Sequence, residues 1–393
     1  MIREGIHRQL EPPDRSFFLF GPRGTGKSTW LRQRFPQARH IDLLRTSLQL
    51  QLAGDPGKLE ALIGDVPAGH WVVLDEVQKV PALLDEVHRL IEERQWRFAL
   101  CGSSARRLMR GDVNLLAGRA ITLNMEPFSS HELGAAFDLR SALEWGLLPI
   151  INADLPEAPA TLDAYLDTYL REEIRAESAV QRLQPFARFL AITGQLSGQV
   201  LNVQNVAREA AVPRATVAGY FDILAQTLLA HLLPAYRPGV KVREGAHPKF
   251  FWVDSGVARA AAGLAFDPID RTWLGQSLET LIYHELRTYN QVKRRHRQIA
   301  YYRTAAGAEI DFVVETRMRR SNRPPQVVCI EVKMASQWNR KWERAIRDLN
   351  DTPGIEVSRM IAVYTGTDTW HYDGLDVLPV QEFLEKLHAG EVF

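Results

Sequence analysis

The octapeptide Gly21-Pro22-Arg23-Gly24-Thr25-Gly26-Lys27-Ser28 constrains this chain more than any other stretch, because it fits the pattern G-x-x-x-x-G-K-[ST] without a mismatch. It directly follows the apolar run 17–20, and Thr29-Trp30-Leu31 comes after it. We therefore expect a strand, a phosphate-binding loop and a helix over about 27–34. The backbone N–H groups of such a loop and the positive end of the helix dipole both point at the phosphates of a nucleotide.

The expected ligand of this loop is ATP or ADP with Mg²⁺. In this arrangement Lys27 reaches the β and γ phosphates, and the Ser28 hydroxyl ligates Mg²⁺. We assign nucleotide binding to Gly21, Pro22, Arg23, Gly24, Thr25, Gly26, Lys27, Ser28 and Thr29.

Length and composition limit the remaining possibilities. A chain of 393 residues is longer than one core usually supports, so two or three domains are expected. The 48 Lys+Arg residues nearly balance the 47 Asp+Glu residues, so any nucleic-acid contact must come from local patches. No apolar run is long enough for a membrane span, the first residues do not open a secretory signal, and both cysteines lie in apolar runs. We expect a cytoplasmic protein without a membrane partner.

The segment 70–76 reads as a Walker B element, because its apolar run ends in Asp75 and Glu76. In a parallel sheet the carboxyl end of this strand lies beside the phosphate loop. Asp75 would then hold the Mg²⁺ shell, and Glu76 would polarise the water that attacks the γ-phosphate. Acidic residues at strand ends also serve as helix N-caps, but the upstream loop favours the catalytic interpretation.

Two further polar positions are candidates for the same reaction. A helix over 81–94 and a strand over 96–101 lead to Gly102-Ser103-Ser104. A polar residue at this place resembles the γ-phosphate sensor of AAA-type ATPases, and Ser103 or Ser104 fits that role; capping the next helix is an equally good account. Of the arginines at 106, 107, 110 and 119, we choose Arg119 as an arginine finger presented to a neighbouring subunit, although a solvated or paired surface arginine is the common alternative. If Arg119 has that role, the protein is a homo-oligomer.

Several of these segments together resemble a known family. The loop, Leu74-Asp75-Glu76, Cys101-Gly102-Ser103-Ser104, Leu116-Ala117-Gly118-Arg119 and the segment 126–133 look like those of bacterial and archaeal AAA-superfamily ATPases with a C-terminal domain of uncharacterised function. The resemblance extends to the helix 165–174 and covers essentially the whole chain. It implies ATP binding and a winged-helix module and leaves the biological task open.

The segment 203–224 has helix-turn-helix spacing, with helices over 203–210 and 214–224 around the turn Ala211-Val212-Pro213. Strands over 228–233 and 249–253 would form a wing, with Arg237, Lys241, Arg243 and Lys249 in or near its tip and available for phosphate contacts. The second helix offers only Arg214 and Thr216 early on, fewer polar groups than base-reading helices present. DNA contact and a structural or protein-docking role both stay open.

The last third carries a second constellation of charged residues. Asp311 lies in the alternating strand 309–314, and the strand 327–333 ends in Glu331 and Lys333, which share one face. This is the arrangement of PD-(D/E)XK nucleases, whose carboxylates bind Mg²⁺ while the lysine orients or activates water. By resemblance Glu279 supplies the acid of the preceding helix, although helical geometry favours Glu285. The choice stays open, and so does retained cleavage, because such a fold also serves as a binding scaffold.

The predicted fold class is α/β, with an AAA-type P-loop NTPase parallel sheet, then an all-α and winged-helix segment, then a mixed α/β nuclease-like domain. We place the P-loop ATPase domain at 1–152, the helical linker and winged helix at 153–255 and the nuclease-like domain at 256–393, with 153–159 as interdomain linker. The predicted protein is an Mg²⁺-dependent ATPase acting on DNA. The alternative is a nucleotide-switched device whose later domains dock a protein partner without cleavage.

Overall fold

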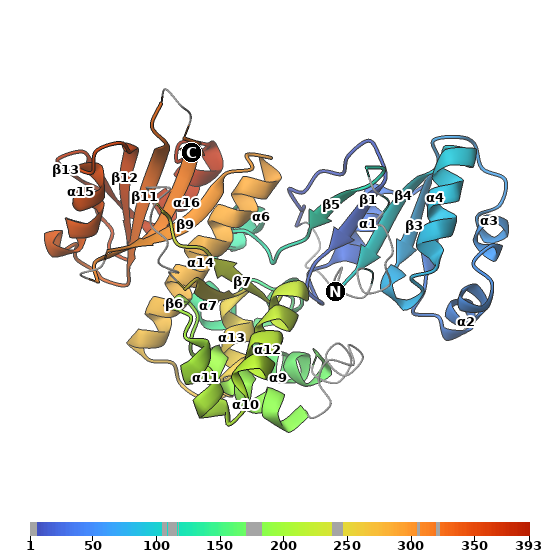
Figure 1. The fold of residues 1–393 in the computed structure, drawn as a ribbon, viewed down its shortest axis with the longest axis horizontal. Coiled ribbons are helices and arrows are strands. Elements are labelled where there is room, and N and C mark those ends of the chain that lie inside the picture. Colours follow the sequence, from blue (N-terminus) through green and yellow to red (C-terminus); the bar gives the residue numbers. More distant parts are fainter. Residues whose placement is uncertain are drawn as a thin grey trace.

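The computed structural model describes residues 6–103, 108, 116, 118–169, 183–237, 247–304, 307–319 and 323–393 (Figure 1). Some predictions fall outside these described residues. They concern Ser104, the arginines at 106, 107 and 110, Lys241, Arg243 and the second half of the helix at 165–174.

The first part of the chain folds into a five-stranded parallel sheet with the order β2-β3-β4-β1-β5. Its elements are β1 Phe17–Phe20, α1 Lys27–Arg34, β2 Arg39–Asp42, α2 Thr46–Gly54, α3 Lys58–Ile63, β3 Trp71–Asp75, η1 Val77–Lys79, α4 Leu83–Arg94, β4 Arg97–Gly102 and β5 Ile121–Asn124. The central strands β1, β3 and β4 are almost wholly apolar and buried, as expected for parallel strands covered by helices on both faces. This order fits a P-loop NTPase fold and brings the carboxyl ends of β1, β3 and β4 to one edge.

The middle part is mostly helical around its own hydrophobic core. It contains α6 Ser130–Leu133, η2 Gly134–Ala136, α7 Leu139–Trp145, α8 Pro149–Asn152, η3 Leu155–Glu157, α9 Ala158–Tyr169, α10 Leu183–Gly194, α11 Val203–Ala210, α12 Arg214–Gln226 and α13 Ser255–Ala261. A small antiparallel sheet of the order β6-β8-β7 joins them, with β6 Gln199–Val200, β7 Ala230–Leu233 and β8 Lys249–Trp252. The helix pair α11 and α12 occupies the predicted helix-turn-helix segment.

The last part is built on a six-stranded mixed sheet of the order β13-β14-β12-β11-β10-β9. Its elements are α14 Arg271–Val292, β9 Gln298–Arg303, β10 Glu309–Arg317, β11 Gln326–Lys333, η5 Arg340–Glu343, α15 Arg344–Asn350, β12 Glu356–Tyr364, β13 Trp370–Tyr372, β14 Leu375–Pro379 and α16 Val380–Ala389. The helices α14 and α16 share one hydrophobic core with the sheet, and α15 packs in a second core. The sheet is therefore covered on both faces.

The segment that follows β5 packs with the later parts of the chain. Phe128, Leu133, Leu143 and Leu147 belong to the same core as α14, and Leu148 and Ile151 belong to the core of the middle part. The first domain predicted from the sequence covers 1–152 and the predicted interdomain linker covers 153–159; both bounds stay predictions. In the structure, residues 128–151 share their hydrophobic cores with the second and third parts, and Figure 1 shows a single connecting segment running from β5 toward α6.

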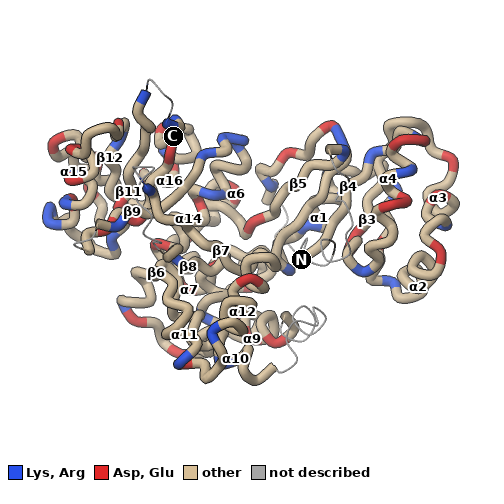
Figure 2. Tube along the Cα trace, in the orientation of Figure 1, with Lys and Arg blue, Asp and Glu red and all other residues tan. Residues whose placement is uncertain are grey.

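Charge is distributed over the whole molecule. Figure 2 shows Lys and Arg together with Asp and Glu in each of the three parts, in keeping with the nearly neutral total. In the described part of the chain, no helix has the length and apolar character needed to span a membrane.

Candidate functional site

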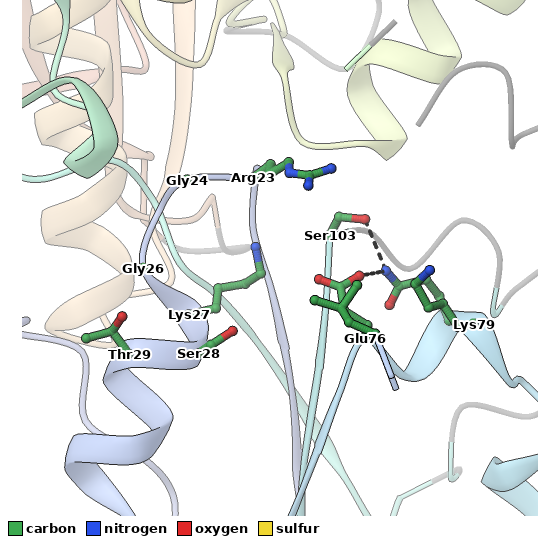
Figure 3. Close-up of a pocket in the computed structure, with 11 residues that line it drawn as sticks. Arg23, Gly24, Gly26, Lys27, Ser28, Thr29, Glu76, Lys79 and Ser103 are labelled. Carbon is green, nitrogen blue, oxygen red and sulfur yellow. Dashed lines mark hydrogen bonds between the residues drawn. The ribbon is translucent and has the colours of Figure 1, made fainter. Parts of the chain in front are cut away.

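A cavity of about 320 Å³ opens at the carboxyl edge of the parallel sheet, between the loop after β1 and the ends of β3 and β4. Figure 3 shows the loop and α1 on one side and Glu76, Lys79 and Ser103 on the other. The lining residues are Arg23, Gly24, Gly26, Lys27, Ser28, Thr29, Leu44, Glu76, Gln78, Lys79 and Ser103.

The phosphate-binding loop holds its lysine on the inside. The Lys27 ammonium is buried and donates hydrogen bonds to the carbonyl oxygens of Gly21 at 2.7 Å and Pro22 at 3.0 Å. Thr25 does not line the cavity; its buried hydroxyl donates to the Pro22 carbonyl at 2.8 Å and so braces the loop. Gly26 has φ +86°, a left-handed conformation that glycine adopts without steric cost. The loop thus places an ammonium group at the N-terminus of α1.

Asp75 of β3 and Ser28 of α1 are the two candidate Mg²⁺ ligands. Asp75 ends β3 with 8% of its surface exposed, and among the described residues its Oδ1 has no hydrogen-bond partner. Both side chains line one small cavity of about 20 Å³. A buried carboxylate oxygen without a partner is costly unless a cation or donor satisfies it, and a hard cation takes carboxylate and hydroxyl oxygens. The two residues therefore fit Mg²⁺.

Glu76 belongs to a short hydrogen-bond network across the cavity. Gln78 Nε2 donates to Glu76 Oε2 at 2.5 Å and to Ser103 Oγ at 3.3 Å, as the dashed lines in Figure 3 show. Glu76 has φ +60°, a left-handed backbone that costs roughly 1–2 kcal/mol for a residue with a Cβ. Such strain is common at functional positions. Sequence reasoning missed Gln78, and its place two residues after Glu76 was the one available signal.

Arg119 lies away from the cavity of its own chain. Its Nε contacts Glu92 Oε1 of α4 at 2.5 Å, and its side chain is 39% exposed. Arg119 is not among the residues that line the cavity. If Arg119 is an arginine finger, it would therefore have to act in the nucleotide site of a neighbouring subunit.

The structure brings the four predicted nuclease-like residues into one cluster and adds two more. Asp311 Oδ2 accepts from the Val332 backbone N–H at 2.8 Å and lies 3.7 Å from Lys333 Nζ, which also contacts Glu331. Glu279 enters from α14. The added members are Glu309, which precedes Asp311 on the same face of β10, and Lys249 of β8.

The predicted position of Lys249 was wrong. We expected it near the wing tip, free for phosphate contacts, but its side chain is only 2% exposed. Its Nζ lies 2.5 Å from Glu309 Oε1, 3.3 Å from Asp311 Oδ1 and 3.6 Å from Glu279 Oε2. Lys249 is the first residue of β8, directly after the expected wing loop, and its side chain is buried. Predicting a wing from the sequence gives neither the first residue of this strand nor the direction of its side chain.

The structure also separates the two candidate acids of α14. Glu285 is fully buried elsewhere, where it accepts hydrogen bonds from the Ser130 backbone N–H at 2.6 Å and from His388 Nε2 at 2.9 Å. Burial opposes its ionisation, but the bond from His388 brings the pKa of Glu285 below its usual value. Of the two acids that the sequence left open, Glu279 is the one that joins the cluster, through its contact with Lys249.

The cluster differs from an open metal site. Burial, reinforced by Asp311, raises the pKa of Glu279 and of Glu331 to about 8 each. Over the described ranges of the chain, no group of three or more His, Cys, Asp or Glu side chains is arranged to hold a metal ion. The carboxylates face the two lysines instead. As it stands, the cluster does not fit a divalent cation.

The helix α12 presents the two predicted DNA-contacting residues of the described chain at its beginning. Arg214 is its first residue, and Arg214 and Thr216 are both exposed. The preceding helix α11 is capped by Asn202, whose side-chain oxygen accepts from the Asn205 backbone N–H at 3.1 Å. These positions are accessible to a partner, and their role stays a prediction.

Comparisons with known proteins agree with the first part of this description. Residues 13–134 match the family model described as an AAA domain, residues 136–268 match "Domain of unknown function (DUF8612)" and residues 274–383 match "Domain of unknown function (DUF4143)". An uncharacterised protein of Haemophilus influenzae is 24% identical over 284 residues, which cover 65% of this chain and 71% of that protein.

Three solved structures are similar to parts of this chain. The Walker-type ATPase PABY2304 of Pyrococcus abyssi has a TM-score of 0.41 at 14% identity and covers 62% of this chain and 90% of its own. The Orc1 protein of Aeropyrum pernix, solved in complex with DNA, has 0.25 at 13%, covering 66% and 88%. A signal transduction ATPase of Pyrococcus horikoshii with a tetratricopeptide repeat sensor has 0.21 at 11%, covering 71% and 46%.

Because these TM-scores are 0.41 or lower, the class of the first domain is assigned from the family match and the sheet order alone. The AAA match of residues 13–134 and the parallel sheet around the loop support a P-loop, AAA-type ATPase domain that binds nucleotide. The identity of the two later parts does not follow from the matches.

Proposed function

We propose that this protein is an Mg²⁺-dependent ATPase that hydrolyses ATP to ADP in the cavity of its first sheet. The observation that carries the proposal is that Lys27, Ser28 and Glu76 line one cavity at the carboxyl edge of β1 and β3, while Ser28 and Asp75 line a smaller one. These side chains belong to two segments about 50 residues apart, and each has the type that phosphoryl transfer needs.

Each residue has a distinct part in the proposed reaction. The ammonium of Lys27 neutralises charge on the transferring phosphoryl group, and the carboxylate of Glu76 orients the attacking water. Asp75 and the Ser28 hydroxyl would hold Mg²⁺, and a bound Mg²⁺ would supply positive charge to offset the charge of the phosphates. Gln78 links Glu76 to Ser103 through hydrogen bonds from its Nε2, which would position the catalytic carboxylate relative to the candidate sensor.

We further propose that nucleotide state controls DNA binding through the middle part of the chain. The exposed beginning of α12, with Arg214 and Thr216, supports this step, because helices of such pairs commonly enter the major groove with their first residues. In this proposal α11, α12 and the small sheet form a winged helix, and an oligomer supplies Arg119 in trans. The six-stranded sheet with its cluster has the nuclease-like fold.

The second candidate function is a nucleotide-switched protein-interaction device, in which the later parts dock a protein and cleave nothing. The buried contact of Lys249 with the carboxylate cluster favours the absence of cleavage. Metal-dependent cleavage is supported only if purified protein cuts single-stranded, duplex or branched DNA with Mg²⁺ or Mn²⁺.

One experiment separates the two candidates. The ATPase rate is measured with and without DNA over a range of salt concentrations, beside the molecular size with and without ATP. Stimulation by DNA that weakens as salt rises supports the DNA-acting ATPase, because phosphate contacts release counterions. Turnover that DNA leaves unchanged, together with a co-purifying protein, supports the docking device.

A further inference from the structure

The turn between α14 and β9 carries a group of exposed positive charges. All of its residues are exposed, and all but the histidine are Lys or Arg: Lys293, Arg294, Arg295, His296 and Arg297. The side chain of Asn290 on α14 accepts a hydrogen bond from the Arg297 backbone N–H at 2.9 Å and donates one to the Arg297 carbonyl oxygen at 2.8 Å. The helix therefore holds the backbone of this turn while the charged side chains stay accessible.

Arginines from a second segment lie beside this turn. β9 and β10 are antiparallel neighbours, and their register places Gln298, the residue after the turn, opposite Glu315 of β10. A cavity of about 380 Å³ lies at this place. Arg297 lines it from the turn, and Arg317 and Arg319 line it from the end of β10. Two segments that are separate in the sequence thus contribute arginines to one cavity.

Carboxylates are scarce among these residues. The segments 293–298 and 315–319 together with Arg323 carry seven Lys and Arg residues and one carboxylate, that of Glu315. We call these residues the basic surface. Glu356 of β12 contacts it, and its pKa is lowered, chiefly by the hydrogen bond from Arg317 and also by the charge of Arg323. Like charges gathered in this way repel one another, and a bound anion relieves that repulsion.

The basic surface is separate from the carboxylate cluster of Asp311 and Glu331. Arg317 pairs with Gln326, the first residue of β11, whereas Lys333, which contacts Glu331, is its last. At a rise of about 3.3 Å per residue, the two ends of this strand lie about 23 Å apart. Figure 2 shows Lys and Arg positions at the end of the last part where the C-terminus of the chain lies.

We propose that the basic surface binds the phosphate backbone of duplex DNA. Arginine predominates in it, and the planar guanidinium donates paired hydrogen bonds to phosphate oxygens. Single strands are usually bound by stacking their bases on aromatic rings, and no aromatic side chain is among the described residues that line the cavity. Positive charge without a stacking platform suits the outside of a duplex. The proposal rests on the DNA-binding step of the proposed function and adds a contact surface distinct from α12.

The turn is also connected to the nucleotide-binding sheet. Gln291, two residues before the turn, donates from its side chain to the carbonyl oxygen of Asn124, the last residue of β5. A Cβ built on Gly21 of the phosphate-binding loop would lie 2.3 Å from the carbonyl oxygen of Met125. The segment 124–125 therefore packs against both the loop and the helix that leads into the basic surface. DNA held there is placed to influence ATP hydrolysis.

The test measures binding of a fluorescein-labelled duplex DNA by the full-length protein, using fluorescence anisotropy across a salt series. The double variant Arg297→Gln with Arg319→Gln removes one exposed charge from each segment. Arg140→Gln with Arg344→Gln is the matched control, because it removes the same net charge from exposed ion pairs of α7 and α15. ATP hydrolysis without DNA is measured for every protein and should be unchanged, since none of these arginines lines the nucleotide cavity.

The proposal expects the double variant to bind the duplex roughly 10-fold more weakly and to lower the salt slope of the affinity by about 2, one for each lost phosphate contact. The control should bind as the parent does. A double variant with the affinity and slope of the parent, or an equal loss in the control, would overturn the proposal and leave DNA contact through α12 standing. A parent that does not bind the duplex would also overturn it, and its rate of ATP hydrolysis without DNA would still report separately on the proposed ATPase.

Two further probes test the choice of ligand. Tighter binding of the single strand than of the duplex, weakened in the double variant, would overturn the assignment to duplex DNA. Vesicles containing phosphatidylserine test a lipid surface, for which the basic surface offers Met318 as its one large, strongly exposed apolar side chain among the described residues. Vesicle binding that is lost in the double variant, without binding of duplex DNA, would overturn the proposal.

The thermal unfolding midpoint of the double variant should equal that of the parent, because both arginines are exposed. If the double variant does not fold, Arg294→Gln, at an exposed position of the turn, replaces it. The salt slope should then fall by about 1. An unchanged slope in folded Arg294→Gln protein would overturn the proposal.

Discussion

The guanidinium of Arg287 donates two hydrogen bonds to the carboxylate of Glu126, at 2.7 Å and 3.3 Å. Glu126 lies just after β5, and Arg287 lies on α14, the helix that also carries Glu279. The side chain of Gln291, one turn further along α14, donates to the carbonyl oxygen of Asn124 at the end of β5. The parallel sheet and the last part of the chain are thus joined by polar contacts along one helix.

Removing Arg287 should destabilise this junction and change its response to acid. Burial alone would raise the pKa of Glu126, but Arg287 overrides it and lowers that pKa to about 2, against 4.5 in the unfolded chain. The contribution of this group to stability is therefore present above about pH 4.5 and is lost as the pH falls toward 2. Urea unfolding should show Arg287→Met less stable by roughly 3 kcal/mol at neutral pH.

The same variant should lose the stabilisation that the parent gains between about pH 2 and pH 4.5. Arg140→Met is the control, because Arg140 makes an exposed ion pair with Glu144 on one helix turn and its loss should have little effect. An Arg287→Met protein with the stability and pH dependence of the parent would show that the contact does not support the junction.

Lys27→Ala should abolish nucleotide binding, because the ammonium of Lys27 lies in the cavity lining and in such loops reaches the β and γ phosphates. Binding of a fluorescent ATP analogue measures the effect. Lys58→Ala, at an exposed position of α3, should bind as the parent does. Unchanged affinity in Lys27→Ala would remove the loop from its assigned role.

Arg119→Ala should retain ATP binding and lose most ATP turnover if the residue acts in a neighbouring subunit. Loss of an arginine finger typically lowers the turnover rate by roughly 10³–10⁵-fold. Mixing Arg119→Ala with Glu76→Gln protein should then restore part of the rate, because one mixed interface carries both intact residues. A mixture as inactive as its components would count against a finger in trans.

Arg214→Ala should weaken DNA binding and lower the salt slope of the affinity by about 1, as expected for the loss of one phosphate contact. Fluorescence anisotropy across a salt series measures this slope. Arg140→Ala, an exposed arginine of α7, is the matched control and should leave both quantities unchanged. A parent protein that does not bind DNA would instead favour protein docking.

The first part of the fold could be predicted because its signals are local. The phosphate-binding loop and the apolar strand before Asp75 each lie within one short segment, and a parallel sheet must bring their ends to the same edge. The P-loop fold was confirmed by the sheet order and the AAA match. Gln78 was missed because its role depends on the side-chain distance to Ser103, which no spacing along the chain encodes.

The later parts show where such reasoning stops. Asp311, Glu331 and Lys333 were grouped correctly, because alternation along adjacent strands fixes a shared face. The position of Lys249 was predicted wrongly. Lys249 lies 30 residues before Glu279 in the sequence, and only tertiary packing brings its side chain to that carboxylate. Glu285 looked central on α14, but His388 and Ser130 from distant segments satisfy it.

The central claim is that Glu76 drives ATP hydrolysis in the cavity beside the phosphate-binding loop. The most direct test is a single-turnover assay of Glu76→Gln with radiolabelled ATP, since the change keeps the size of the side chain and removes its charge. The account predicts that this variant retains bound ATP with Mg²⁺ and does not convert it to ADP. Turnover at the rate of the unmodified protein would contradict the claim.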